Sequence, residues 1–468
     1  ASNNIAIGND ALAANTTGAD NVAVGTAALD ANTTADGNTA VGSSALGANT
    51  TGVDNTALGY GALFANTTAS NNTGLGKSAL AANTTGAENV AVGADAGTAN
   101  TTGAYNIAIG YRALDTNTTG DFNVAIGRRA LDANTTADNN TAVGASALEA
   151  NTTGAENVAV GALALDANTT GANVVAVGYK ALSTDTKGFG SVAIGNQALE
   201  NQNFTSNTDT FNTAVGYFAG NDITTGDRNT FVGGLAGDAT DDGVGNTAVG
   251  YLALSANCGN ANVAVGIECL TVCTGSSNAA MGQDAGGSLT SGGNNLFLGY
   301  QSGITGSPGG AQTTGSNEIF LGDEDITAAN IQVDWTVASD QRDKTDFTAL
   351  DLGLDFVKAL APVTYKWDKR SKYGDKTADD YDLAAQTPDG THKENWLDIG
   401  FKAQEVEALE IAAGYNKSSN TNLISSHTSD GKQMGLQYSK FVPILVKAIQ
   451  EQNALIESLT ARITTLEG

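Results

Sequence analysis

The chain has 468 residues, 58 of them glycine, and its 22 basic side chains stand against 49 acidic ones, a formal net charge of −27. Most of the excess lies before residue 339, where 7 basic residues accompany 29 acidic ones. A surface this acidic repels phosphate backbones and anionic lipid headgroups. We therefore expect no nucleic-acid partner and no membrane insertion. No stretch of eighteen apolar residues is present either.

Glycine recurs twelve times at an unbroken spacing of seventeen residues, from Gly8 to Gly195. The rhythm loosens afterwards but continues to Gly322. A strict period of this length predicts one supersecondary unit stacked on copies of itself. At roughly 4.8 Å per turn, about nineteen turns predict a shaft of roughly 90 Å.

Within each repeat, a branched, a small and an aliphatic residue precede the glycine, as in Val22–Val24, which predicts a strand. Ala stands three residues after the glycine and Leu four residues after it. In the twelve regular repeats, Gly97 is the one residue that replaces this Leu. An Asn-Thr-Thr loop, as at Asn15 and Asn32, closes the repeat, with Asp185 in the eleventh place. Asn tolerates left-handed backbone and bonds its own main chain, as a tight corner requires.

The predicted core is thin, because seventeen residues enclose little space and the inward side chains are small. A single rod would therefore expose an apolar face along its length, which three chains side by side would cover. We predict a mainly β fold, with a trimeric parallel β-roll or solenoid shaft over residues 1–325. Because Ala1 lies inside a repeat, we expect an attachment domain upstream.

Three cysteines, Cys258, Cys269 and Cys273, stand at irregular positions in the looser repeats. An odd number in such positions argues against a disulfide framework and for folding in a reducing cytosol.

Beyond the repeats, glycine becomes sparse and helical periodicity appears. The predicted elements, in chain order, are a linker over 326–338 that contains Trp335, a helix over 347–360, a strand over 363–367, a polar excursion over 368–395, a helix over 401–411 and a long helix from about Tyr438.

The last helix carries a heptad seam of residues, all apolar except Gln452, at alternating steps of four and three. Its members are Leu445, Ile449, Gln452, Ile456, Leu459, Ile463 and Leu466. This pattern predicts a short parallel coiled coil, although Ile at a with Leu at d by itself favours two strands over three. The alternative is a helix packed on its own domain.

Four segments carry a resemblance to a known family. They are Ser-Asp-Gln-Arg-Asp-Lys at 339–344, Leu-Ala-Pro-Val-Thr-Tyr at 360–365, Gly-Phe-Lys-Ala-Gln-Glu-Val at 400–406, and the run from Tyr-Ser-Lys-Phe-Val-Pro at 438–443 to Glu451. In this order they resemble the intramolecular chaperone domain of phage tail spikes and fibres, the peptidase S74 family. The resemblance implies that 339–468 form a small α+β domain that helps three chains fold into a shaft and then cuts itself off.

The resemblance also implies roles for individual residues. Ser339 would be the nucleophile and Lys344 its general base, and the bond broken would join Ala338 to Ser339. Asp340 and Arg342 belong to the same motif.

The sequence departs from the family pattern at Asp343 and at Thr345-Asp346-Phe347, where related copies usually carry an aliphatic residue and then a short polar-apolar run. A serine hydroxyl is a weak nucleophile, and a lysine with a free pKa of about 10.4 must be desolvated or placed beside another cation before it accepts a proton. If assembly completes the burial of Lys344, cleavage reports that the trimer has formed. The plainer alternative makes Ser339 and Asp340 a helix N-cap or turn and Lys344 a solvated charge.

The repeats themselves, with Asn-Val-Ala-Val-Gly and Asn-Ile-Ala-Ile-Gly segments, resemble the head repeats of trimeric autotransporter adhesins, which form left-handed parallel β-rolls.

Other motifs predict less. Gly-Lys-Ser at 76–78 lacks the earlier glycine of a phosphate-binding loop, because Asn71 stands in its place. The acidic run 323–325 lacks calcium-loop spacing and is more typical of solvated turn residues. His392 and His427 lie far apart in polar stretches. We therefore predict no metal and no cofactor.

These observations favour a structural tail fibre of a phage or phage-like particle, assembled in the host cytoplasm and extracellular in the mature virion. Its expected partners are two further copies of itself, a host cell-surface receptor or glycan, and tail or baseplate proteins that bind an upstream region. Two alternatives remain: a bacterial surface adhesin shaft with the same chaperone, and a solenoid whose Thr ladder binds an ordered surface such as ice.

Overall fold

The computed structural model describes residues 2–332, 337–376, 380–416, 423–428 and 430–468. The chain divides into two compact units, Ala1–Leu296 and Phe297–Gly468. The shaft and linker boundaries predicted at 325 and 338 stay predictions, because this division lies before the last repeats.

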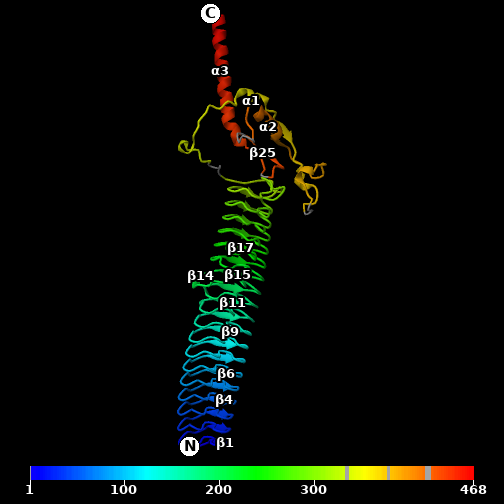
Figure 1. Cartoon of the computed structure of the whole chain (residues 1–468). Helices are drawn as coiled ribbons and strands as arrows, with labels where there is room; N and C mark the ends of the chain where they lie inside the picture. Colours follow the sequence, from blue (N-terminus) through cyan, green and yellow to red (C-terminus); the bar gives the residue numbers. More distant parts are fainter. Residues whose placement is uncertain (1, 333–336, 377–379, 417–422, 429) are drawn as a thin grey trace. The chain divides into compact units, whose positions relative to one another are not determined.

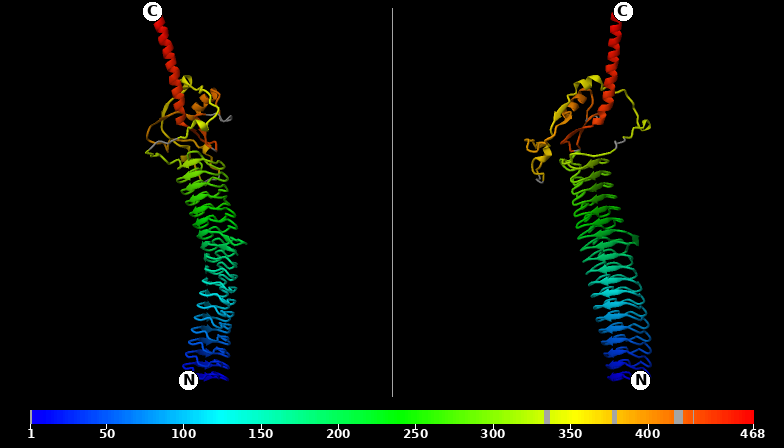
Figure 2. Two further views of the ribbon diagram at one scale, coloured as in Figure 1. Left: turned by 90° about the vertical axis from the view of Figure 1, so that its left-hand side faces the viewer. Right: turned by 180° about the vertical axis from the view of Figure 1, so that it is seen from behind.

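The first unit is a parallel β-solenoid with one short strand per turn, and its turns stack in sequence order (Figures 1 and 2). Each strand pairs with its equivalent one repeat later, as Ile5 with Val22 and Ala6 with Ala23. The strands are β1 (Ile5–Ile7), β2 (Val22–Val24), β3 (Thr39–Val41), β4 (Thr56–Leu58), β5 (Thr73–Leu75), β6 (Val90–Val92), β7 (Ile107–Ile109), β8 (Val124–Ile126), β9 (Thr141–Val143), β10 (Val158–Val160), β11 (Val175–Val177), β13 (Val192–Ile194), β15 (Thr213–Val215), β16 (Thr230–Val232), β17 (Thr247–Val249), β18 (Val263–Val265) and β19 (Ala279–Met281). A widened turn adds the pair β12 (Gly188–Phe189) and β14 (Thr208–Asp209). The predicted solenoid of 17-residue repeats is confirmed.

The interior of most turns holds a few alanine, leucine and asparagine side chains. In the second repeat, Asn21, Ala23, Leu29 and Asn32 are all fully buried. The amides form two ladders along the solenoid. In the first, Asn21 Oδ1 accepts the backbone N–H of Asn38 at 2.9 Å, and in the second, Asn32 Oδ1 accepts a side-chain N–H of Asn49 at 3.1 Å. Buried polar groups are tolerated because these ladders satisfy them.

The corner geometry differs from the prediction. Positive φ occurs at Ala27 (54°) and Leu29 (51°), whereas Asn32 is not among the described residues with positive φ. The left-handed positions therefore lie at Ala27 and Leu29 and, in the return loop, at Asp20 (58°), not at the loop asparagine. The other part of the prediction holds, because Asn32 Nδ2 donates to the carbonyl of Ala35 at 3.2 Å.

The outward strand face is largely apolar, with threonine at one of its positions in some strands, such as Thr39 of β3. On either side of each buried central alanine, a strand places a β-branched or aliphatic side chain on the outside, and Ile109, Ile126 and Ile194 are among the exposed ones. The single solenoid thus leaves uncovered the kind of face that the sequence predicts.

The second unit begins with two more repeat-like turns and continues into a small α+β region. Its regular elements are β20 (Leu296–Leu298, whose first residue ends the first unit), β21 (Ile319–Leu321), α1 (Leu354–Ala359), β22 (Val363–Tyr365), β23 (Asp398–Gly400), α2 (Ala403–Ala412), β24 (Ser425–His427), β25 (Met434–Leu436) and α3 (Phe441–Glu467), with 3₁₀ turns η1 (Gln341–Asp343), η2 (Arg370–Lys372), η3 (Leu383–Ala385) and η5 (Tyr438–Lys440). β22 pairs with β23 and β24 with β25, both antiparallel. The first predicted helix is shorter than expected: Gly353 is the N-cap of α1, so residues 347–352 precede it.

A compact hydrophobic core joins these elements. Its buried members are Leu352, Phe356, Val406, Ile424, Phe441 and Ile444. They come from α1, α2, the start of α3 and the segments beside them, so elements distant in sequence share one core.

Helix α3 packs on this domain only at its beginning, through Phe441, Ile444 and Ala448. The heptad seam uses other positions. Its apolar members Leu445, Ile449, Ile456, Leu459, Ile463 and Leu466 are all exposed in the single chain. The alternative of a helix packed on its own domain therefore fits only the first turns, and the coiled coil stays a prediction.

Candidate functional site

The predicted site begins at a short 3₁₀ turn, η1, which Asp340 caps. The Asp340 carboxylate accepts the backbone N–H of Arg342 at 2.9 Å and also pairs with its guanidinium. These hydrogen bonds hold the pKa of Asp340 below its ordinary value. The plainer alternative of a capped turn is therefore correct for Asp340, and the cap fixes the backbone between Ser339 and Lys344.

Across this turn, Lys344 Nζ lies 2.6 Å from Ser339 Oγ. The five-residue spacing thus brings together the two groups predicted as base and nucleophile, at a distance suited to proton transfer. Ala338, Ser339 and Lys344 are all exposed in the single chain. The geometry is that of a serine–lysine pair, and the catalytic roles of its members stay predictions.

The linker reaches this pair from the last repeat. Its residues 333–336, which include the predicted Trp335, lie outside the described residues. Val337 and Ala338 are described and exposed, so the predicted cleavage point is accessible to solvent.

The other segments of the family motif pack together. Phe401 stacks on Phe441 with ring centroids 5.2 Å apart, and its backbone N–H donates to the hydroxyl of Tyr438 at 3.3 Å. Gly400 permits this approach, because a Cβ there would lie 2.5 Å from the Tyr438 hydroxyl. The third and fourth motif segments are therefore packed against each other.

Sequence reasoning missed two glutamates that organise this domain. Glu410 is fully buried in α2 and accepts the backbone N–H groups of Leu423, Ile424 and Ser425 at 2.6–2.9 Å. Glu451 of α3 accepts the N–H of Leu354, the first residue of α1, at 2.7 Å. Neither role has a local sequence signal, because the bonded backbone lies 13 or more residues away.

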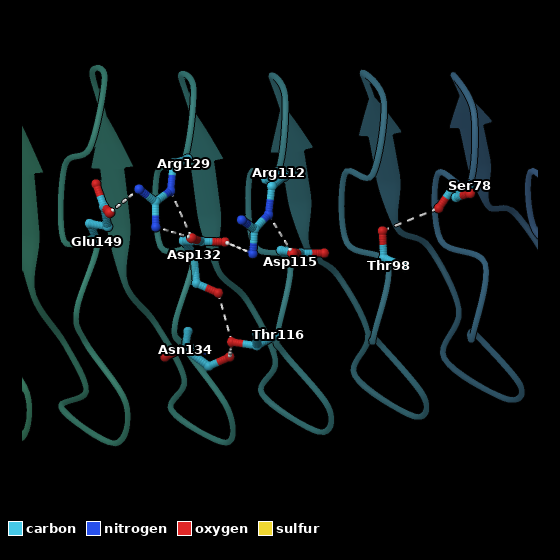
Figure 3. A network of polar contacts seen from close by, with 9 residues as sticks. All are labelled: Ser78, Thr98, Arg112, Asp115, Thr116, Arg129, Asp132, Asn134 and Glu149. Carbon is cyan, nitrogen blue, oxygen red and sulfur yellow. Dashed lines mark hydrogen bonds and ion pairs between the residues drawn. The ribbon is translucent and has the colours of Figure 1, made fainter.

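Ion pairs run along the surface of the first unit, as Figure 3 shows. Arg112 pairs with Asp115 in its own turn at 2.8 Å and with Asp132 in the next at 3.5 Å. Arg129 repeats the pattern with Asp132 at 2.9 Å and Glu149 at 2.7 Å. These contacts tie successive turns together.

The Asn-Thr-Thr loops use one of their two hydroxyl columns internally. Thr50 Oγ1, for example, donates to the carbonyl of Thr67 one turn further at 3.0 Å. The second threonine of most loops, such as Thr51, is exposed, whereas Thr170 is partly buried and its hydroxyl donates to Asn207 Oδ1 at 3.2 Å. Half of the predicted Thr ladder is thus bound to the main chain.

Two further findings concern the described residues alone. In that part of the chain, no three His, Cys, Asp or Glu side chains are grouped so that they could hold a metal ion. None of its helices combines the length and apolar character needed to cross a membrane.

The three cysteines are buried free thiols, and burial raises the pKa of Cys273 to about 11.

Residues 339–415 match the family model described as chaperone of endosialidase, the peptidase S74 family. The match begins at Ser339, includes the first three motif segments and lies entirely behind the repeats, which supports a chaperone domain in the C-terminal region. No curated protein and no solved structure matches the chain significantly.

Proposed function

We propose that this chain is a fibre subunit of a phage or phage-like particle and serves host attachment. Three copies form the shaft, and the C-terminal domain directs their trimerisation and folding and then cuts itself off before Ser339. The observation that carries the proposal is the match of residues 339–415 to a chaperone family directly behind a solenoid.

The apolar outer strand face supports assembly. Exposed aliphatic side chains such as Ile109 and Ile126 recur from turn to turn, and a face of this kind is stabilised by burial against another chain. A threefold axis parallel to the stack gives every copy the same contact. The same parallel arrangement of chains would also cover the exposed seam of α3.

The Ser339–Lys344 pair supports self-cleavage by a balanced route. Ser339 Oγ attacks the carbonyl carbon of Ala338 while Lys344 takes the hydroxyl proton, and this proton passes to the departing amide nitrogen of Ser339. Water then hydrolyses the resulting ester. The products are a carboxylate at Ala338 and a free amine at Ser339.

Assembly is the proposed trigger. A lysine amine acts as a base only when it has lost its proton, which removal of surrounding water favours. Lys344 is exposed in the single chain. Neighbouring chains would cover it, so cleavage would follow trimer formation.

Denaturing electrophoresis of freshly purified protein tests the cleavage. Wild type should give two fragments, 1–338 and 339–468, and Ser339→Ala should stay intact. Ser458→Ala, at an exposed serine outside the pair and beyond the motif segments, is the matched control and should be cut like wild type. The same fragments from Ser339→Ala, or a wild-type trimer that stays intact, would remove self-cleavage from the proposal.

Sedimentation equilibrium tests the assembly. We expect a trimer for wild type, and a shift toward monomer or aggregate when Ile109 and Ile126 are both changed to Asp. Thr153→Asp, at an exposed loop position, should leave the trimer intact. A folded wild-type monomer at micromolar concentration would contradict the proposal.

The attachment role needs a separate test. Antibodies raised against the shaft should label the tails of particles in immunogold electron microscopy. Label on a cell envelope without particles would instead favour the adhesin alternative.

A further inference from the structure

The acidic run 323–325 does not stand free in solvent. Glu324 pairs with Lys376, and Asp325 pairs with Lys372. The backbone carbonyl of Glu324 also accepts a hydrogen bond from Lys369 Nζ at 2.6 Å. Three lysines on one short segment thus converge on one acidic turn.

A second contact lies beside the first. The Asp430 carboxylate accepts the backbone N–H of Ala311 at 3.3 Å. Gly310 and Gly306 allow the chain to come close: a Cβ at Gly310 would lie 2.8 Å from Asp430 Oδ1, and one at Gly306 would lie 3.0 Å from the Cβ of Ser371. The close backbone contacts and the ion pairs therefore join the same parts of the chain: the segment 306–325 on one side, and the segment 369–376 with Asp430 on the other.

The lysine segment is fixed to its own domain. Arg370 Nη2 donates to the carbonyl of Lys432 at 2.7 Å, and its Nη1 donates to that of Leu383 at 3.4 Å. Ser371 is buried. Lys369 and Lys372 are thus presented from an anchored 3₁₀ turn, η2, which lowers the entropy lost when they pair.

The central pair is desolvated. The Glu324 side chain is only 6% exposed, and burial lowers the pKa of Lys376. A charge held in such a site is costly without its partner, so removal of either member should weaken the contact strongly.

Between the same segments lies a cavity of about 830 Å³, lined by Gly306, Pro308 and Ile326 on one side and by Trp367, Lys369 and Ser371 on the other. A space of this size with charged walls holds water. The two sides are therefore not sealed by continuous apolar packing, which leaves the ion pairs as the main attachment.

We propose that these contacts form an electrostatic clasp, made of Lys369, Lys372, Lys376 and Asp430 against the segment 306–325, that keeps the C-terminal domain bound after the chain is cut between the two. This inference rests on the proposed function, since cleavage at Ala338 leaves the acidic turn on the N-terminal fragment and the lysines on the C-terminal one. The partner recognised by the acidic turn is the chain's own removed domain. Salt, rather than cleavage alone, then releases it.

The test replaces self-cleavage with cleavage by an added protease. A site-specific protease sequence is inserted between Ala328 and Ala329 in full-length Ser339→Ala protein, which is then cut and passed over a size-exclusion column. We expect the fragments to coelute in 0.05 M NaCl and to separate in 1 M NaCl, because salt screens the more exposed Lys372–Asp325 pair and lets the clasp open there. Since the cut is engineered, this result does not depend on whether Ser339 is a nucleophile.

Charge reversal identifies the residues. Lys376→Glu should weaken retention at low salt by at least about tenfold, and Glu324→Lys in the same chain should restore it. Lys358→Glu, which changes a lysine paired with Asp355 inside α1, is the matched control and should retain the fragment. Separation of the unmodified fragments at low salt, retention in 1 M NaCl, or no rescue by the double reversal would overturn the proposal.

Discussion

The ring of Phe231 fills the space that Gly237 leaves inside the solenoid. Phe231 is fully buried at the centre of β16, a position that alanine occupies in most of the remaining turns. A Cβ on Gly237 would lie 2.6 Å from its ring. Gly237 stands where most turns place a buried leucine. One large and one small residue thus exchange places at conserved volume, as a close-packed interior requires.

This exchange predicts a strong coupling between the two positions. Phe231→Ala should lower the free energy of unfolding by about 3–4 kcal/mol, because it opens a cavity. Gly237→Leu alone should also destabilise, because it overpacks against the ring. The double variant restores the common Ala and Leu pattern, and φ at Gly237 (61°) is close to that of Leu29 (51°), so it should recover most of the loss.

Urea denaturation of the four proteins at one protein concentration gives the coupling energy. Additive losses in the double variant would show that the two residues do not share one space.

The glycine column predicts a contrast within a single turn. Gly59 has φ of 139°, and a Cβ there would run into the carbonyl group of Gly76 in the next turn. Gly61 has φ of 63°, but a Cβ there meets no described atom within 4 Å, and Ala27 already occupies the equivalent position. Gly59→Ala should therefore cost about 3 kcal/mol or more, and Gly61→Ala should stay within about 1 kcal/mol.

Thermal unfolding followed by circular dichroism distinguishes the two variants. Equal effects would mean that the turns can move apart, and that backbone contact does not set the repeat.

The seventeen-residue repeat could be predicted because its strictest column has a steric cause. Gly59 and its equivalents meet the backbone of the next turn, and no other residue fits. The positive φ of Leu29 could not be predicted, because leucine rarely adopts it and only stacking against neighbouring turns maintains it. The pairing of Lys344 with Ser339 was expected from the family resemblance, whereas the pairing of Glu324 with Lys376 depends on a fold-back of some fifty residues, for which the sequence has no signal.

Asp166 should make the free energy of unfolding depend on pH. Burial, followed by the nearby charge of Glu149, raises the pKa of this carboxyl to about 6, and one of its oxygens is buried without a hydrogen-bond partner among the described residues. Since the folded state binds this proton more tightly than the unfolded chain does, the stability contributed is present below about pH 4 and is lost as the pH rises to about 6.

Asp166→Asn removes the ionisation, so it should stabilise the protein at pH 7.5 by about 1 kcal/mol, after allowance for the half-exposed site. At pH 4 its effect should vanish. Denaturation midpoints at both pH values test this. Asp115→Asn, in the same column but paired with Arg112 at 2.8 Å, should show no gain at pH 7.5. A gain of Asp166→Asn that does not depend on pH would point to another cause.

Glu410 should be essential for the C-terminal domain. Its buried carboxylate is the acceptor for three successive N–H groups that lead into β24, and Glu410→Ala would leave those donors buried and unsatisfied. The expected cost is about 3 kcal/mol or more. Glu405→Ala removes an exposed glutamate from the same helix and should cost less than about 1 kcal/mol.

The two glutamate variants also connect fold with function. If the C-terminal domain directs assembly, Glu410→Ala should lower the yield of folded trimer in proportion to its loss of stability, and Glu405→Ala should not. Size-exclusion chromatography of soluble protein, together with urea denaturation, measures both quantities. A normal trimer from a destabilised Glu410→Ala chain would mean that the shaft assembles without help from this domain, because the apolar strand faces alone would then suffice to bring three chains together.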